Sequence, residues 1–203
     1  FASYLYDASG RATWVTSAGP MESANTYRGK LFTAAGGQAL TGAYRAPTSQ
    51  TAVGDIVLQF TSSVQATMTW PGGTVPLQRY DYGGINDLRA NAPQAGGWWN
   101  PAESGRGFGI EVQGNTLLMA GYMYDTSGNP LWYLASGALD ATLSNWSGSW
   151  TQYADGQTLT GAYRRPTLSN GAVGSVTLNF PTPTSAILTL PDGRQVPLSR
   201  FEF

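Results

Sequence analysis

The stretch Leu40-Thr41-Gly42-Ala43-Tyr44-Arg45 recurs without change at Leu159-Thr160-Gly161-Ala162-Tyr163-Arg164. The flanking segments match in the same order, in these pairs: YLYDASG at 4–10 and YMYDTSG at 122–128, AVG at 52–54 and 172–174, VPL at 75–77 and 196–198. The offset between the copies changes only from 118 to 121, so insertions are few. Self-similarity at a nearly fixed spacing indicates a repeated structural unit. The sequence therefore predicts two copies of one unit.

Within each copy, apolar residues alternate with polar ones, as at Ile56, Leu58 and Phe60 in the first copy. This period is typical of strands with one buried face, and no window shows a capped helical period. The second copy predicts eight strands, near 105–113, 116–125, 130–138, 146–153, 158–165, 174–180, 185–190 and 194–202. Short strands joined by tight turns predict an all-β fold of two homologous antiparallel up-and-down meander modules, each an eight-stranded barrel or a sandwich.

The first copy is shorter than the second, because Phe1 aligns with Met119 in the middle of a predicted strand. We expect module 1 at residues 1–83 to lack its first strand, a linker at 84–96, and a complete module 2 at 97–203. An unpaired strand edge would then be formed by Phe1, Ala2, Ser3, Tyr4 and Tyr6. Three explanations stay open: truncation of a longer repeat protein, repair by residues 97–113 of the same chain, or a strand from another protein or another copy.

The composition excludes several classes of function. Charged residues make up 11% of the 203 residues, against about 25% in ordinary soluble domains. The net charge is −1, which gives no electrostatic footprint for nucleic acid, and no apolar run predicts membrane insertion. Cysteine and histidine are absent, which excludes disulfides, imidazole bases and Cys/His zinc sites. We predict no catalytic residues, no metal and no cofactor.

Aromatic residues carry the binding hypothesis. Rows of Trp and Tyr on neighbouring strands can stack sugar rings or enclose an apolar ligand, although they can equally fill the interior and rim of a barrel. The candidate binding residues for a ligand or partner are Trp98, Trp99, Asn100, Glu103, Arg106, Tyr122, Tyr124, Trp132, Trp146 and Trp150. Trp98 and Trp99 are adjacent, so on an extended chain they point to opposite faces.

Two carboxylate motifs invite a chemical interpretation. Glu103 follows a tryptophan pair and could serve as a general acid, but no second carboxylate at a suitable distance can be identified. We favour a structural role, in which Glu103 pairs with Arg106 or with a backbone N–H group. Asp7 and Asp125 precede Ser-Gly at matching positions, and we expect a turn in which the carboxylate accepts from the backbone rather than a calcium site.

The segment Gly97-Trp98-Trp99-Asn100-Pro101-Ala102-Glu103-Ser104-Gly105-Arg106-Gly107 resembles the WWNPxESGxG repeat of exported bacterial proteins of largely unassigned function. The resemblance covers most of the second unit and implies export and β-structure, without an activity. A shorter stretch, Gly148-Ser149-Trp150 followed by residues 155–163, resembles the opening of avidin-like barrels. That match covers about twenty residues and transfers no ligand site.

We therefore expect a non-enzymatic bacterial protein, extracellular or on the cell surface, that acts as a structural or interaction module. It would assemble through strand donation, for example as a subunit of a filament or surface layer. The alternative is a β-barrel that binds carbohydrate or a small apolar molecule through its Trp and Tyr residues. A carboxylate-based glycosidase centred on Glu103 is the third reading.

Overall fold

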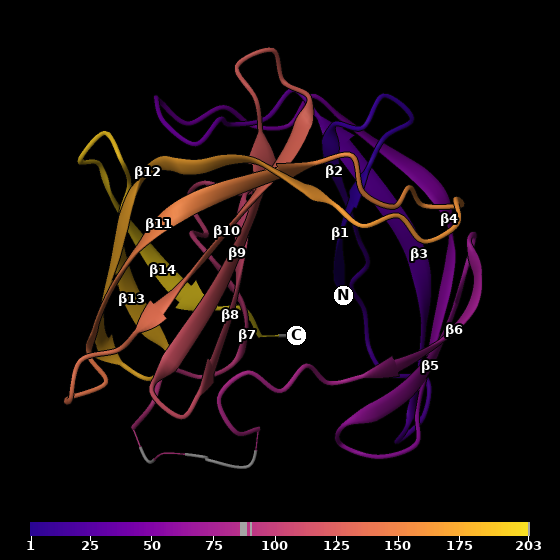
Figure 1. The fold of residues 1–203 in the computed structure, drawn as a ribbon, viewed down its shortest axis with the longest axis horizontal. Coiled ribbons are helices and arrows are strands. Elements are labelled where there is room, and N and C mark those ends of the chain that lie inside the picture. The colour runs from indigo at the N-terminus through magenta and orange to yellow at the C-terminus, as the bar shows by residue number, and fades with distance from the viewer. Residues whose placement is uncertain (86–88, 90, 203) are drawn as a thin grey trace.

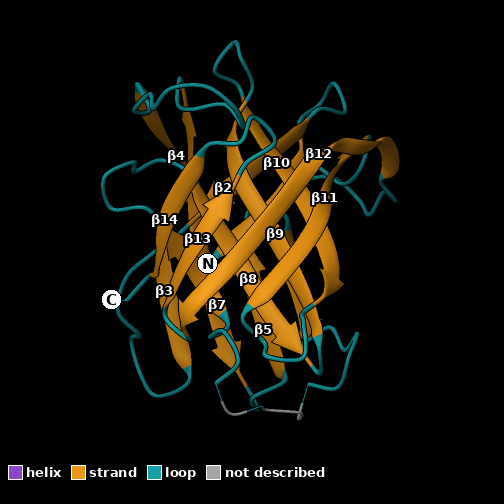
Figure 2. Ribbon diagram, turned by 90° about the vertical axis from the view of Figure 1, so that its left-hand side faces the viewer, coloured by secondary structure: helices purple, strands orange, loops and turns teal. Residues whose placement is uncertain are grey.

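The computed structural model describes residues 1–85, 89 and 91–202, and these form strands joined by turns and loops (Figures 1 and 2). The strands are β1 Ala2–Tyr6, β2 Ala12–Thr16, β3 Thr26–Ala35, β4 Ser49–Phe60, β5 Gln65–Trp70, β6 Gly73–Gln78, β7 Gly96–Trp99, β8 Gly107–Gln113, β9 Thr116–Tyr124, β10 Pro130–Ala138, β11 Asn145–Ala154, β12 Thr167–Thr182, β13 Ser185–Thr189 and β14 Gln195–Arg200. No helix of these residues is long and apolar enough to cross a membrane.

The strands form two antiparallel sheets. Sheet A has the order β1-β2-β3-β4-β5-β6 and is a half-barrel. The other eight strands close into barrel B, in the order β10-β11-β12-β13-β14-β7-β8-β9. The two bodies lie side by side, with the chain ends in the space between them (Figure 1). The predicted all-β fold with meander modules is confirmed, and module 2 is a barrel rather than a sandwich.

The six strands of sheet A correspond in order to β9–β14 of barrel B, because the repeated motifs fall on matching elements. Tyr4 on β1 matches Tyr122 on β9, and Leu77 on β6 matches Leu198 on β14. Among the described residues, sheet A has no counterpart of β7 and β8. The part of the repeat that sheet A lacks is therefore a pair of strands.

One predicted strand was wrong. Residues 158–165 form a loop between β11 and β12, and the eighth strand of the barrel is instead β7, Gly96–Trp99. The matching loops of both modules leave their own sheet. The physical reason is that each loop inserts its leucine into the other module, as described below.

Each module has its own apolar core. Barrel B is filled by inward side chains from all its strands, and the largest fully buried ones are Trp98, Trp150 and Phe108. Sheet A buries a smaller cluster on its concave face, centred on Leu31 and Ile56. The difference in core size follows from closure, since a closed barrel covers its inward residues on every side.

The modules pack through the outer faces of β1–β2 and β9–β10, in an arrangement with approximate two-fold symmetry. Trp14 Nε1 donates to the Met123 carbonyl at 2.9 Å, and its counterpart Trp132 Nε1 donates to the Leu5 carbonyl at 3.1 Å. The Trp14 ring contacts the Tyr124 ring edge-on at 5.6 Å, and the Trp132 ring contacts that of Tyr6 at 5.7 Å. Such a self-complementary interface is what two copies of one surface form around a two-fold axis.

The loops that contain the repeated LTGAYR stretch are exchanged between the modules. The loop after β3 crosses to barrel B, where Tyr124 N donates to the Gln38 carbonyl at 3.1 Å and Leu40 joins the barrel core. The loop after β11 crosses to sheet A, where Tyr6 N donates to the Gln157 carbonyl at 3.1 Å and Leu159 packs on its core. In Figure 1 the orange segment before β12 runs from barrel B across to the side of β3 and β4. Each module thus covers part of the core of the other.

Candidate functional site: the open wall of sheet A

The first feature of the site is an unpaired backbone edge on β1. Phe1 and Ser17 exchange two backbone hydrogen bonds, with N···O distances of 2.8 and 2.9 Å. Because bonding alternates along an antiparallel ladder, the backbone groups of Ala2 and Tyr4 point away from β2. The matching residues on β9 pair with β8, but no strand of the described chain pairs with Ala2 and Tyr4 on that side.

The second feature is a pair of exposed apolar side chains whose counterparts are buried. Phe60 on β4 is 40% exposed, whereas the matching Phe180 on β12 is 5% exposed. Leu77 on β6 is 37% exposed, whereas the matching Leu198 is 2% exposed. Sheet A is therefore open at both ends, with the unpaired backbone of Ala2 and Tyr4 on the β1 edge and the exposed side chains of Phe60 and Leu77 on β4 and β6. We call these two sides of the gap together the open wall.

In barrel B the corresponding gap is closed by β7 and β8. The Trp98 ring packs edge-on against the Phe180 ring with centroids 5.7 Å apart, and β7 pairs with β14 through Trp99↔Ser199 and Trp98↔Arg200. On the other side β8 pairs with β9 along its length. The two strands together cover the residues whose counterparts in sheet A stay exposed.

The predicted aromatic binding residues do not gather on one surface. Trp98, Trp146 and Trp150 point into barrel B and are buried there. Tyr122, Tyr124 and Trp132 lie in the interface between the modules, next to Tyr4, Tyr6 and Trp14. Burial raises the pKa of the Tyr6 hydroxyl to about 12, with the neighbouring Tyr153 and Asp155 adding to the shift. Most of this aromatic set holds the fold together.

Trp99 lies on the outer face of β7, as expected from its position beside Trp98, and its ring packs edge-on against that of Phe201 at 5.2 Å. Asn100 begins the loop between β7 and β8, where its Oδ1 accepts from Ala102 N at 3.0 Å and its carbonyl accepts from Glu103 N at 2.9 Å. Asn100 therefore shapes the loop.

The Glu103 carboxylate is held by two arginines at one end of barrel B. Its Oε2 accepts from Arg106 at 2.7 Å, and its Oε1 accepts from Arg194 at 3.0 Å. The Arg106 side chain is 2% exposed, and burial lowers its pKa to about 10, with the nearby Arg194 charge acting in the same direction. The predicted pairing of Glu103 with Arg106 is confirmed. The loop of module 1 covers this end, where Tyr44 donates to the Ser104 carbonyl at 3.2 Å.

The carboxylates before the Ser-Gly turns behave as expected. Asp7 Oδ1 accepts from Ser9 N at 2.8 Å, and Asp125 Oδ1 accepts from Asn129 N at 2.8 Å. Burial raises the pKa of each carboxyl. Hydrogen bonds from Ser9 and Arg11 to Asp7, and from Asn129 and Ser127 to Asp125, lower the pKa by a larger amount, so the net shift is downward. The described residues contain no cluster of three or more His, Cys, Asp or Glu side chains that could hold a metal ion.

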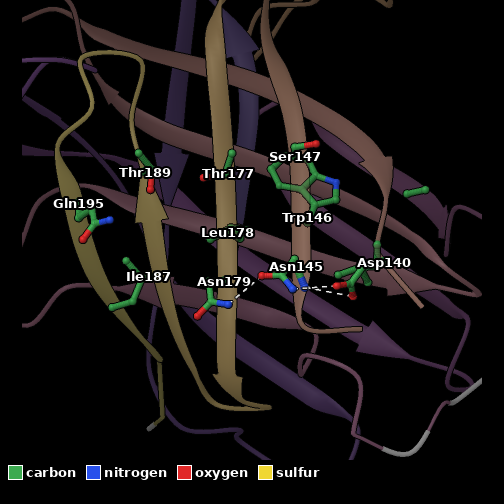
Figure 3. A pocket seen from close by; sticks show the side chains of 12 residues that line it. Asp140, Asn145, Trp146, Ser147, Thr177, Leu178, Asn179, Ile187, Thr189 and Gln195 are labelled. Atoms are coloured by element: carbon green, nitrogen blue, oxygen red, sulfur yellow. Dashed lines mark hydrogen bonds between the residues drawn. The ribbon is translucent and has the colours of Figure 1, made fainter. Parts of the chain in front are cut away.

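A shallow hollow of about 690 Å³ lies on the outer face of β11–β14 (Figure 3). Three of its polar side chains bond to one another: Asn145 donates to Asp140 at 2.7 Å and accepts from Asn179 at 2.8 Å. Hydrogen bonds from Asn145 and Thr142 hold the pKa of Asp140 below its usual range. Asp140, Asn145 and Asn179 are therefore engaged with one another, and the remaining polar side chains of the hollow are those of Ser147, Thr177, Thr189 and Gln195.

A larger groove of about 1080 Å³ lies between the modules. Its walls come from the outer faces of β1–β3 and β7–β9, and they include Tyr4, Phe32, Trp99 and Phe201. Glu111 also lines the groove, and it accepts from Arg79 at 2.7 Å. In this groove the predicted Trp99 and the β1 edge meet on a common surface.

Sequence reasoning named the β1 side of the open wall and missed Phe60 and Leu77. The signal was available, because both residues sit at inward positions of alternating strands and both align with core residues of the second copy. A residue aligned with a core position, in a module that lacks the strand covering it, is predicted to be exposed.

No family model, no curated protein and no solved structure matches this chain in the comparisons made.

Proposed function

We propose that this chain is a structural and interaction module whose sheet A binds a two-stranded segment of another polypeptide along the open wall. The observation that carries the proposal is the paired exposure of Phe60 and Leu77, at positions where barrel B buries Phe180 and Leu198 beneath its own hairpin. Strand addition of this kind combines backbone hydrogen bonds with pockets for alternate side chains.

The energetic case rests on two terms. Covering the exposed parts of Phe60 and Leu77 would contribute about 1–2 kcal/mol, from the area removed from water. Pairing the free N–H and C=O groups of Ala2 and Tyr4 would contribute about 0.5–1.5 kcal/mol for each hydrogen bond. An exposed strand edge beside an apolar face is also a template for unwanted pairing, so its coverage by a partner serves solubility.

The β7–β8 hairpin of barrel B is not free to act as the donor while the barrel is closed. In barrel B, β7 is bonded on both sides, to β14 and β8, and β8 is bonded to β7 and β9. Donation of this hairpin to the next copy, as in a head-to-tail filament, would first require barrel B to open. Export to the bacterial cell surface, which the WWNPxESGxG resemblance implies, belongs to the same proposal.

The test is self-association of the purified chain, because an uncovered wall should pair with other copies. We expect sedimentation velocity to show association that rises with concentration in the wild-type chain and is lost in Leu77→Lys, which places a charge on the inward side of the edge. The control is Gln78→Lys, one residue along on the outward side, which should associate as the wild type does. A wild-type chain that stays monomeric at every concentration, with Phe60 and Leu77 exposed, would contradict the proposal.

A second candidate function is ligand binding in the groove between the modules. The observation that favours it is the volume of about 1080 Å³, which is large enough for an oligosaccharide or an apolar molecule, next to the Trp99 and Phe201 rings. Carbohydrate screening by thermal shift tests this candidate, with Trp99→Ala as the variant that should lose stabilisation. A hit that Trp99→Ala leaves unchanged would place the ligand elsewhere.

A further inference from the structure

We infer that the partner of the open wall is a hairpin with the pattern of this chain's own β7–β8 segment: an inward tryptophan, a loop, and a second strand that begins Gly-Phe-Gly. This inference rests on the proposed function and adds the chemistry by which the partner is recognised. The inference follows from the repeat, because in barrel B the β7–β8 hairpin covers the positions that match the open wall of sheet A.

The inward tryptophan is the first requirement. In barrel B, Trp98 fills the space beside Phe180, and it is 1% exposed. Its Nε1 donates to the Gln94 carbonyl at 3.0 Å, so the indole carries its own hydrogen-bond partner on the same segment. The Phe60 ring of sheet A presents the same type of surface, open and at the matching place. A donor side chain of this size, with its polar atom already satisfied, would cover Phe60.

Further inward apolar residues on the second strand are the next requirement. Phe108 and Ile110 of β8 are both buried in barrel B, and the Phe108 ring stacks on Trp150 with centroids 6.5 Å apart. Period-two alternation places these side chains on the same face of the hairpin as Trp98. A donor with this alternation would present one apolar face to the concave core of sheet A.

Glycine at the outward position opposite Tyr4 is the third requirement. In barrel B, Gly107 pairs with Tyr122, and a Cβ atom at Gly107 would lie 2.1 Å from the Tyr122 hydroxyl oxygen. Tyr4 holds the matching position on β1, with a matching ring contact to the tryptophan of the other module, at 5.6 Å against 5.3 Å. A donor residue with a Cβ atom opposite Tyr4 would therefore clash with the Tyr4 side chain, whereas glycine would not.

The inference is tested by adding a synthetic peptide of residues 94–114 to the full chain and following backbone amide exchange. Binding at the open wall should slow exchange at Ala2 and Tyr4. Ala120 and Tyr122, which already pair with β8, serve as internal controls and should not change. A change at those two amides instead would mean that the peptide replaces β8 in barrel B, and that result would contradict the inference.

Matched peptide variants test the pattern itself. Trp98→Ala in the peptide should weaken binding by about tenfold or more, whereas Trp99→Ala should change it by less than about threefold. Gly107→Val should abolish protection of Tyr4, and Gly97→Val, whose Cβ would meet its nearest heavy atom at 3.6 Å, should retain it.

The outcomes separate the inference from the proposed function. If an alternating hairpin of unrelated sequence protects Ala2 and Tyr4 equally well, sheet A is a strand acceptor without the predicted specificity. If no peptide protects these amides and the wild-type chain is monomeric, both the inference and the proposed function are wrong.

Discussion

Sheet A and barrel B are built from the same repeat, yet only one of them is closed. Six strands of barrel B have counterparts in sheet A, and the two that do not, β7 and β8, bury Phe180 and Leu198. Without them, the matching Phe60 and Leu77 are more than one-third exposed. The comparison shows that β7 and β8 cover the core of barrel B as well as completing its hydrogen bonds. Where sheet A lacks their counterparts, apolar side chains and a strand edge are exposed.

The largest effect is expected for Trp98→Ala, which removes from barrel B the side chain that distinguishes it from sheet A. Truncation of a fully buried tryptophan costs about 3–5 kcal/mol, through lost burial and the cavity left behind. Trp99→Ala on the outer face should cost about 1 kcal/mol, the order of one aromatic contact. Urea unfolding checks both variants, and equal losses would contradict the assignment of Trp98 to the closing wall.

A direct comparison of the modules comes from the two aligned phenylalanines. Phe180→Ala should destabilise the protein by about 3 kcal/mol, whereas Phe60→Ala should cost about 1 kcal/mol because its ring is already partly in water. The free energy of unfolding is measured for each variant by chemical denaturation. Equal costs would mean that Phe60 is covered in solution.

The exchanged loops are tested by Leu40→Ala. Leu40 belongs to module 1 in sequence but packs into the core of barrel B, where it is 7% exposed. We expect a loss of about 2 kcal/mol, with the fastest increase in amide exchange in barrel B. Thr41→Ala, at the exposed neighbouring position, is the control and should have little effect. Faster exchange confined to sheet A would show that the loop stabilises only its own module.

The smallest effect is expected in the interface between the modules. The Tyr6 hydroxyl is buried and has no hydrogen-bond partner among the described residues, so Tyr6→Phe should leave stability at neutral pH unchanged or raise it by up to about 1 kcal/mol. The control is Tyr80→Phe, at an exposed position, which should change nothing.

The pH dependence of the same variant follows from the raised pKa. An unfolded tyrosine ionises near pH 10, whereas Tyr6 in the folded chain keeps its proton until about 12. Between these values the unfolded state loses protons that the folded state retains, so stability falls as the pH rises. Tyr6→Phe should therefore reduce the loss of stability between about pH 10 and 12 in thermal melts. An unchanged slope would place the Tyr6 hydroxyl in contact with water.

Local sequence accounted for much of this fold. Period-two alternation and turn residues located β8–β11 and β13–β14 in module 2, and the aligned motifs predicted that Tyr4 and Tyr122 hold matching positions. The Glu103–Arg106 pair could also be predicted, because a carboxylate and a guanidinium three residues apart in one loop are within reach of each other. These features depend on neighbours along the chain.

The features that sequence did not reveal all depend on contacts between distant residues. Residues 158–165 lie where the sequence predicts a strand, and Leu159 instead docks in a loop against the core of the other module. Trp132 is a candidate binding residue by its sequence, and the structure makes it and its counterpart Trp14 the reciprocal donors of the interface, bonded to carbonyls more than one hundred residues away.

The sequence by itself determined the repeat, the strand class and the positions of the inward and outward faces, because alternation and turn chemistry act over a few residues. Which module would close, where the LTGAYR loops would dock and which aromatic residues would be buried between modules were decided only in the tertiary structure. The physical reason is that an apolar face has no preferred partner in the sequence. It is covered by whatever surface of matching shape the rest of the chain brings to it, and for Phe60 and Leu77 the described residues bring none.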